Sequence, residues 1–335
     1  MTVPTNTVQT FAMVGIREDL SDVITNIAPM EVPFYSMCKK GSAKNRTPEW
    51  QKDSLAAGDP TNKRVEGDAA GDADAGSQPT RLKNVVQLMD KVVEVSTTAQ
   101  AVETAGRSSE LKFQVAKKGK ELKRDIELRI TGNFASVLGN ASTAGELGGA
   151  EAWIETNVSR GNTGASGGFN TGTGLVEVAD DGDARTYTET LLKDVVRQAW
   201  EAGGDPSIIM CTGSKKQTSS GFAGIATQYR DSGQSRKQAV ILGAADVYVS
   251  DFGEHRIVPN RFMGAGTGRS AGGNGLYDGR SVLVLDPKTW TLKFLQPFKT
   301  EPLAKTGHSD KRMLSCEFTL AVSDEAANGV IADLS

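Results

Sequence analysis

Histidine, cysteine and aromatic residues are scarce in this sequence. Its 335 residues include 2 histidines, 3 cysteines and 6% aromatic residues. His255 and His308 stand alone without an HExxH pattern, and Cys38, Cys211 and Cys316 form no CxxC pair. Zinc sites and disulfide frameworks need closely spaced ligands or a regular set of cysteines. The sequence therefore predicts no catalytic residue, no metal site and no cofactor.

Long apolar runs and an excess of basic residues are also missing. No stretch reaches the roughly 18 apolar residues of a membrane span, and residues 1–9 lack the basic and apolar regions of a signal peptide. The formal net charge is −3, whereas a dedicated nucleic-acid-binding protein usually has a basic face. We expect no membrane partner, synthesis in the cytoplasm and reduced cysteines.

Glycine is plentiful, with 37 residues, but its motifs do not match nucleotide-binding loops. Gly213 precedes Ser214 and two lysines, yet position 208, where a phosphate-binding loop needs its first glycine, is Ile208. Residues 266–271 fit a loose GxGxxA pattern, but no helix is predicted after them. We interpret this second motif as a flexible loop.

Residues 1–45 are predicted to form an arm. A short amphipathic helix is indicated by five apolar residues at helical spacing: Ile16, Leu20, Val23, Ile24 and Ile27. The apolar run that follows, residues 30–35, is predicted to be extended. Two interpretations stay open, because the arm could fold back on its own core or be covered by another subunit.

Residues 46–96 are predicted to form a long hairpin. Its middle, residues 57–80, carries five acidic and two basic side chains and few apolar ones, so it cannot form a core of its own. The return run, residues 84–96, is rich in valine and is predicted to be a strand.

Residues 97–140 contain the clearest helix, expected from Ser108 to Thr131. An apolar stripe at spacings of four and seven is its predicted core: Leu111, Val115, Leu122, Ile126 and Ile130. Gly119 is expected to weaken or bend it. Basic residues interleave with Glu110, Glu121, Asp125 and Glu127, which is typical of a solvated face with i,i+4 pairs. The alternative is contact with nucleic acid or an acidic partner.

An α/β pattern follows. Trp153 and Ile154 are expected to anchor a glycine-rich stretch, and residues 188–202 to form a helix whose apolar face includes Trp200. Short strands are predicted at 207–211, 239–250, 256–262, 281–285, 289–294 and 313–322, with a turn at 286–288.

The order of these parts resembles a Hong Kong 97-type major capsid protein of a tailed bacteriophage. The phrases at 28–35, 39–41, 49–51 and 119–127 are similar to a podovirus-like branch of that family. The resemblance implies an α+β fold with these parts: an N-terminal arm (1–45), an extended β-hairpin loop (46–96), the spine helix of a peripheral domain (97–140), an α/β axial domain (141–275) and returning strands of the peripheral domain (276–335).

The resemblance also implies a function without catalysis. Such subunits assemble into hexamers and pentamers that close an icosahedral shell around double-stranded DNA. The implied partners are other copies, portal and scaffolding proteins, a cement or decoration protein, and packaged DNA held non-specifically. The implied location is the virion, after assembly in the host cytoplasm. The candidate contacts between subunits are Phe34, Tyr35, Trp50, Asp68, Asp72, Asp74, Lys117, Lys120 and Arg124.

Two other functions remain open at this point. The first is an encapsulin-like nanocompartment shell of the same fold, which encloses enzymes in place of a genome. The second is a soluble α/β enzyme with a site in residues 185–275, which the scarcity of histidine disfavours. No Lys–Asn cross-linking pair is recognised, so covalent linkage of subunits is not predicted.

Overall fold

The computed structural model describes residues 31–67, 76, 78–102, 109–222, 246–270, 277, 279–305 and 307–335. The helices described in these ranges are α1 (Pro33–Met37), α2 (Thr97–Ala101), α3 (Glu110–Thr131), α4 (Ala150–Trp153), α5 (Glu189–Glu201) and α6 (Gly213–Ser220). The strands are β1 (Lys39–Ser42), β2 (Glu49–Lys52), β3 (Thr80–Lys83), β4 (Gln87–Ser96), β5 (Val158–Ser159), β6 (Gly168–Asn170), β7 (Leu175–Glu177), β8 (Ile208–Cys211), β9 (Val247–Ser250), β10 (Gly253–Pro259), β11 (Val282–Leu285), β12 (Trp290–Pro302), β13 (Ser309–Val322) and β14 (Gly329–Ile331).

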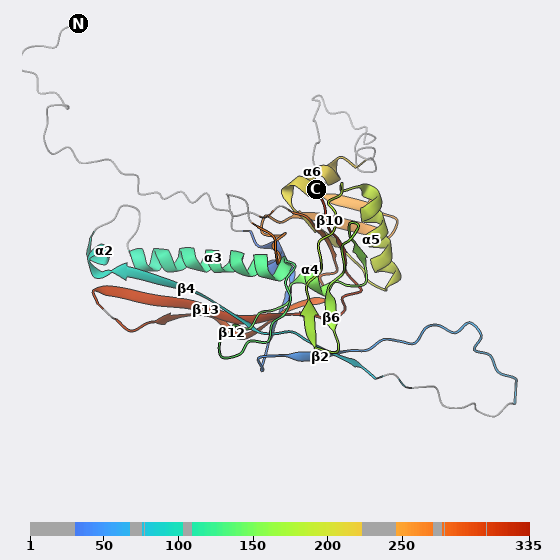
Figure 1. Ribbon diagram of the computed structural model, residues 1–335, viewed down its shortest axis with the longest axis horizontal. Coiled ribbons are helices and arrows are strands. Elements are labelled where there is room, and N and C mark those ends of the chain that lie inside the picture. The colour runs from blue at the N-terminus through green and yellow to red at the C-terminus, as the bar shows by residue number, and fades with distance from the viewer. Residues whose placement is uncertain are drawn as a thin grey trace, which may run out of the picture.

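The long helix α3 lies along a four-stranded sheet, and together they form the elongated half of the molecule (Figure 1). The strand order is β1-β12-β13-β4, with β1 parallel to β12 and the other neighbours antiparallel. The helix begins at the Ser109 cap, as expected, and continues through Gly119. Of the predicted stripe, Leu122, Ile126 and Ile130 are buried, whereas the other two members are only partly buried.

A six-stranded sheet forms the centre of the second half, in the order β5-β14-β11-β8-β10-β9. Helix α5 packs against β14, and α6 lies near β10. The predicted apolar face of α5 is confirmed for its buried residues Leu192, Val195 and Val196. It is wrong for Trp200, which is 53% exposed and packs on Phe252 with 5.0 Å between ring centroids.

Two local predictions were wrong, one in the type of secondary structure and the other in the strand partner. The apolar run at 30–35 is not wholly extended, because α1 begins at Pro33, where a fixed φ favours the first helical position. The return run of the hairpin is a strand, as predicted, but β4 pairs with β13. Only β2 and β3 pair across the base of the loop.

The two sheets draw strands from distant parts of the chain. Strand β11 was expected beside the long helix, yet it lies in the middle of the six-stranded sheet, between β14 and β8. Strand β1 follows the predicted arm and pairs with β12. Trp153 and Ile154 are completely buried, which confirms their predicted role as anchors. The part of the predicted strand at 239–250 that is described is β9.

Candidate subunit interface

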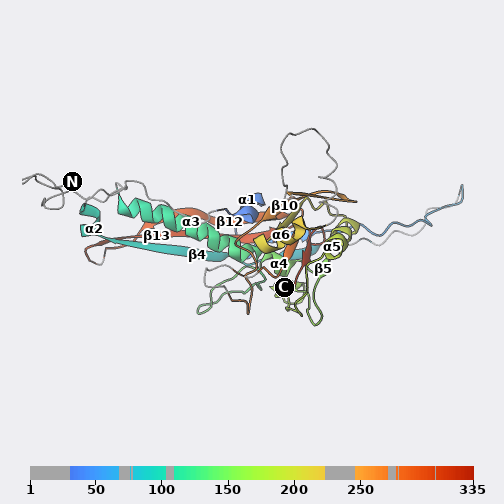
Figure 2. The same ribbon diagram turned by 90° about the horizontal axis from the view of Figure 1, so that it is seen from above.

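The extended loop leaves the body of the molecule between β2 and β3 (Figures 1 and 2). Trp50 fixes its base, because the indole Nε1 donates a hydrogen bond to the Val322 carbonyl at 2.7 Å. The Trp50 ring lies 5.8 Å from that of Trp153, and Lys293 Nζ lies 5.0 Å from its centroid. Trp50 was a candidate contact between subunits, and in this structure its half-buried side chain anchors the loop within its own subunit.

Apolar side chains of the extended loop are largely uncovered by the rest of the subunit. Leu55 is 99% exposed and Val65 is 77% exposed. Residues 53–59 and 62–65 have no regular structure. The candidate contacts Asp68, Asp72 and Asp74 lie outside the described residues. Exposed aliphatic side chains on a segment without a core are typical of a surface that another molecule covers.

The candidates at the start of the described chain lie in different environments. Phe34 is completely buried and meets Trp290 edge-on at 5.4 Å between centroids. The Phe34 ring therefore belongs to the core of its own subunit, and its contact with a neighbouring subunit stays a prediction. Tyr35 is partly exposed, and the ammonium of Lys40 lies 3.6 Å from its ring centroid.

The charged side chains of α3 are partly used within the subunit. Asp125 pairs with Lys91 of β4 at 2.6 Å, and Glu121 pairs with Lys118 at 2.7 Å. Lys117 and Lys120 are exposed. The guanidinium of Arg124 lies 5.9 Å from the Phe262 ring and is only partly exposed. The two exposed lysines are available to a neighbour, so their role as contacts stays a prediction.

Glu127 joins three parts of the chain and was wrongly predicted to face solvent. It is completely buried, and its carboxylate accepts hydrogen bonds from the Phe34 and Tyr35 N–H groups at 2.7 and 2.8 Å. Asn260 Nδ2 donates a third at 2.7 Å. Burial raises the pKa of Glu127 to about 7, although these hydrogen bonds and the charge of Lys40 act in the opposite direction.

The Glu127 carboxylate replaces the cap that α1 lacks. The residue before α1 is Val32, whose side chain cannot accept a hydrogen bond. The first N–H groups of a helix have no partner within it, so an acceptor from elsewhere must satisfy them. Glu127 thus fixes the position of α1.

A second buried carboxylate holds the 264–270 segment in place. Arg269 donates to both oxygens of Glu151, at 2.8 and 3.1 Å, and also binds Asp181. Ser281 donates to Glu151 at 2.9 Å, and Arg160 Nη2 lies 3.9 Å away. Burial disfavours the charge on Arg269, but hydrogen bonds and the charges of both acids raise its pKa. The described part of the predicted flexible loop is therefore fixed to α4.

The three cysteines and His255 are buried or hydrogen-bonded. Burial raises the pKa of Cys211 and of Cys316 to about 12, and it also raises that of Cys38. His255 is bonded through both ring nitrogens, to Pro206 O and Ser250 Oγ, and burial lowers its pKa. Among the described residues, no three metal-binding side chains gather in one place.

No helix in the described ranges is long and apolar enough to cross a bilayer.

Comparisons with known proteins cover nearly the whole chain. Residues 3–335 match the family model described as the SU10 major capsid protein. A curated relative, the major capsid protein of Escherichia phage Phieco32, is 30% identical and covers 95% of this chain and 94% of its own length.

Solved structures show the fold at low sequence identity. The capsid of a native GTA particle is similar with a TM-score of 0.59, at 10% identity over 98% of this chain and 100% of the other. The encapsulin SrpI of Synechococcus elongatus PCC 7942 gives 0.53, at 9% identity over 95% and 93%. The expected Hong Kong 97-type α+β fold is confirmed. Because residues 3–335, nearly the whole chain, match the family model, the chain belongs to the SU10 major capsid protein family.

Proposed function

We propose that this chain is the shell subunit of a tailed phage, and that copies assemble as hexamers and pentamers into an icosahedral shell around double-stranded DNA. The match of residues 3–335 to a family of major capsid proteins carries this proposal. The extended loop supports it, because Leu55 and Val65 are exposed on a segment that projects from the body (Figure 1). A surface of this kind becomes stable when a neighbouring copy covers it.

The loop of one copy would lie across the α3 region of the next. Residues 57–80 carry two basic and five acidic side chains, 2 − 5 = −3, and residues 107–130 carry eight basic and four acidic ones, 8 − 4 = +4. Opposite charge on two surfaces guides docking and penalises wrong registers. The acidic tip would meet Lys117, Lys120 and Arg124 of the neighbour.

A nanocompartment shell is the alternative that the fold alone permits, since SrpI is similar in structure. At 9% identity that likeness concerns the fold only. The 30% identical phage protein, which spans nearly the same length, favours a genome as the contents.

Further partners follow from a shell that fills with DNA. Portal, scaffolding and cement or decoration proteins would bind its subunits, and packaged DNA would touch the inner face without sequence preference. Assembly in the bacterial cytoplasm belongs to the same proposal.

The contents of purified particles test the proposal. Particles that contain the chain should appear as closed shells by negative-stain microscopy and protect double-stranded DNA from added nuclease. Mass spectrometry of the same particles should find the chain as the most abundant protein. Closed shells that hold a cargo enzyme and no DNA would support the nanocompartment, and a chain that forms no shell in any preparation would contradict both.

A further inference from the structure

The extended loop is attached to the body through one face of β2. Trp50 and Lys52 are partly buried, whereas the residues next to them are exposed. Alternate side chains of a strand point to the same side, so both face the body. The Trp50 indole donates to the Val322 carbonyl, and Lys52 Nζ lies 2.6 Å from Asp324 Oδ1. Two contacts, two residues apart on each segment, fix the direction of β2 as well as its position.

Asp324 is itself held in place by the turn after β13. Its Oδ1 accepts a second hydrogen bond from the Ala326 N–H at 3.1 Å, and its carbonyl accepts one from Asn328 Nδ2 at 2.9 Å. The buried Asn328 in turn accepts a hydrogen bond from Trp290 Nε1 at 2.8 Å. The turn is therefore a fixed point of the body, against which Lys52 holds the loop.

A cavity of about 220 Å³ lies beside this ion pair and leaves the base of the loop room to tilt. Ser54 and Thr80 line it on the side of the loop, and Glu155 and Glu325 line it on the side of the body. Burial and the charges of Glu325 and Glu177 raise the pKa of Glu155. The wall of the body that faces the loop is thus crowded with negative charge.

Charge makes the Lys52 contact different from the rest of the loop. Residues 57–80 carry two basic and five acidic side chains, so the acidic wall repels the loop as a whole, whereas it attracts the Lys52 ammonium. The side chains of Lys52 and Asp324 are 30% and 41% exposed, and an ion pair so exposed adds little to the stability of a fold. The pair can therefore direct the loop without being needed to hold the subunit together.

We propose that the Lys52–Asp324 ion pair sets the angle at which the extended loop leaves the subunit, and through that angle the curvature of the shell. The inference rests on the proposed function, in which the loop lies across the next copy. A tilt at the base of the loop then becomes a tilt between two neighbouring copies, repeated at every interface. Without the pair, the loop takes several angles over the cavity and copies join at several curvatures.

The size of assembled shells tests this inference on the full-length chain. Lys52→Met removes the ammonium and keeps the apolar stem, and Asp324→Asn removes the charge and keeps the oxygen that binds the Ala326 N–H. In both variants the share of particles in the main diameter class, measured by negative-stain microscopy, should fall on the order of twofold or more. The urea midpoint of unfolding should stay at the wild-type value, and Lys52→Arg should restore the wild-type diameter.

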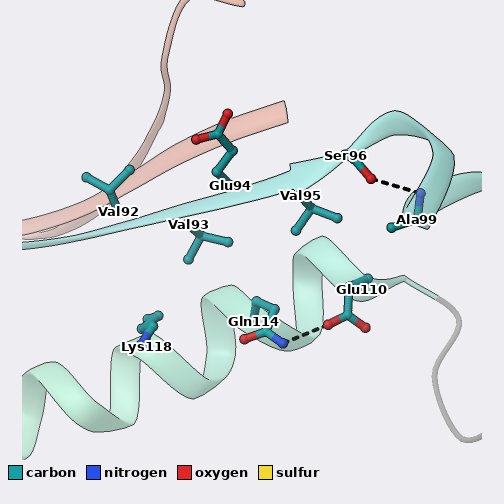
Figure 3. A pocket seen from close by; sticks show the side chains of 9 residues that line it. All are labelled: Val92, Val93, Glu94, Val95, Ser96, Ala99, Glu110, Gln114 and Lys118. Atoms are coloured by element: carbon teal, nitrogen blue, oxygen red, sulfur yellow. Dashed lines mark hydrogen bonds between the residues drawn. The ribbon is translucent and has the colours of Figure 1, made fainter. Parts of the chain in front are cut away.

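The matched control is Lys311→Met, which removes another ion pair of similar exposure. The side chains of Lys311 and Glu94 are 29% and 49% exposed, and Glu94 points away from α3 (Figure 3). Lys311 lies about 36 Å from Val322 along β13, so its loss should leave the distribution of shell diameters unchanged.

The angle of the loop can also be measured on the unassembled chain. The three native cysteines are buried, so spin labels attach to cysteines introduced at two exposed positions, Leu55→Cys and Thr171→Cys. The distribution of distances between the labels should broaden in Lys52→Met and return to the wild-type width in Lys52→Arg.

Equal label distances, or equal shell diameters, in Lys52→Met and the wild type would overturn the inference. A wild type that forms no shell would contradict the proposed function instead, and the label distances would still decide whether Lys52 sets the angle of the loop.

Discussion

The carboxylate of Glu127 caps the helix that begins at Pro33, through hydrogen bonds of 2.7 and 2.8 Å to the N–H groups of Phe34 and Tyr35. The bond to Phe34 spans 93 positions of sequence. A third bond from Asn260 ties the same carboxylate to the segment after β10. One buried side chain therefore sets the relative positions of the N-terminal segment, the long helix and the six-stranded sheet.

The pH dependence of stability should reveal this buried group. Burial raises the pKa of Glu127 from 4.5 to about 7 in the folded chain, so the folded state binds the proton more tightly than the unfolded state does. Its contribution to the free energy of unfolding should be fully present below pH 4.5 and lost as pH rises through 7. The loss should be about 3 kcal/mol at most.

Urea unfolding of the wild type and of Glu127→Gln at several pH values isolates this contribution. The stability difference, wild type minus variant, should fall between pH 4.5 and 7 and stay constant above. A difference that rises over this interval would mean that the three hydrogen bonds outweigh burial.

The core of the long helix should be sensitive to truncation. Leu122 and Ile126 are buried against the sheet, so Leu122→Ala or Ile126→Ala should cost on the order of 2–4 kcal/mol. The exposed Lys120 on the same helix provides the control, and Lys120→Ala should change stability by less than about 0.5 kcal/mol. Thermal or urea unfolding measures all three, and equal losses would place the wrong face against the sheet.

Removing Arg269 should leave Glu151 buried without its main partner. Arg269→Ala should destabilise the chain by about 3–5 kcal/mol. The double variant Arg269→Met with Glu151→Met should recover much of that loss, because two apolar side chains need no charged partner. Unfolding free energies of the two variants measure how much of the stability loss the double variant recovers. A double variant as unstable as Arg269→Ala would show that the pair does more than neutralise charge.

The acidic tip of the extended loop should affect assembly and leave folding intact. Changing Asp68, Asp72 and Asp74 together to Asn should slow assembly at low salt, since each exposed pair contributes only about 0–1 kcal/mol but recurs at every interface. Screening over roughly 8–10 Å should reduce the wild-type advantage at physiological salt and above. Light scattering at two salt concentrations measures the rate.

The matched control for the tip is Asp194→Asn, which removes an exposed carboxylate from α5. It should assemble at the wild-type rate. If the triple variant also assembles normally at low salt, the acidic tip serves only to keep the loop in solution.

Periodicity made much of this fold predictable. The long helix, the helix at 189–201 and the strand at 282–285 carry regular apolar spacing, and each formed close to its expected bounds. Strand β12 instead runs eight residues past its expected end at 294, and β14 was not expected. The helix α1 was missed because it has only five residues and depends on a cap supplied by Glu127. Local spacing contains no information about a partner so far away.

Strand pairing and buried charges were harder to infer. The valine-rich run at 84–96 predicts a strand correctly, but a pattern of period two does not name the neighbour, so its pairing with β13 was not foreseen. Arg269 lies in a glycine-rich stretch that is typical of a loop, and only the folded chain brings it to Glu151. The exposure of Lys117 and Lys120 could be predicted, because both residues lie off the apolar stripe of the helix.

The strand order of the six-stranded sheet constrains when the subunit can finish folding during synthesis. Its central strand β11 lies between β8 and β14, and β14 ends at Ile331. Strand β8 precedes β11 in the chain, but the other edge of β11 stays unpaired until β14 has been synthesised, and β1 must likewise wait for β12. The six-stranded sheet can therefore be completed only after β14 has been made.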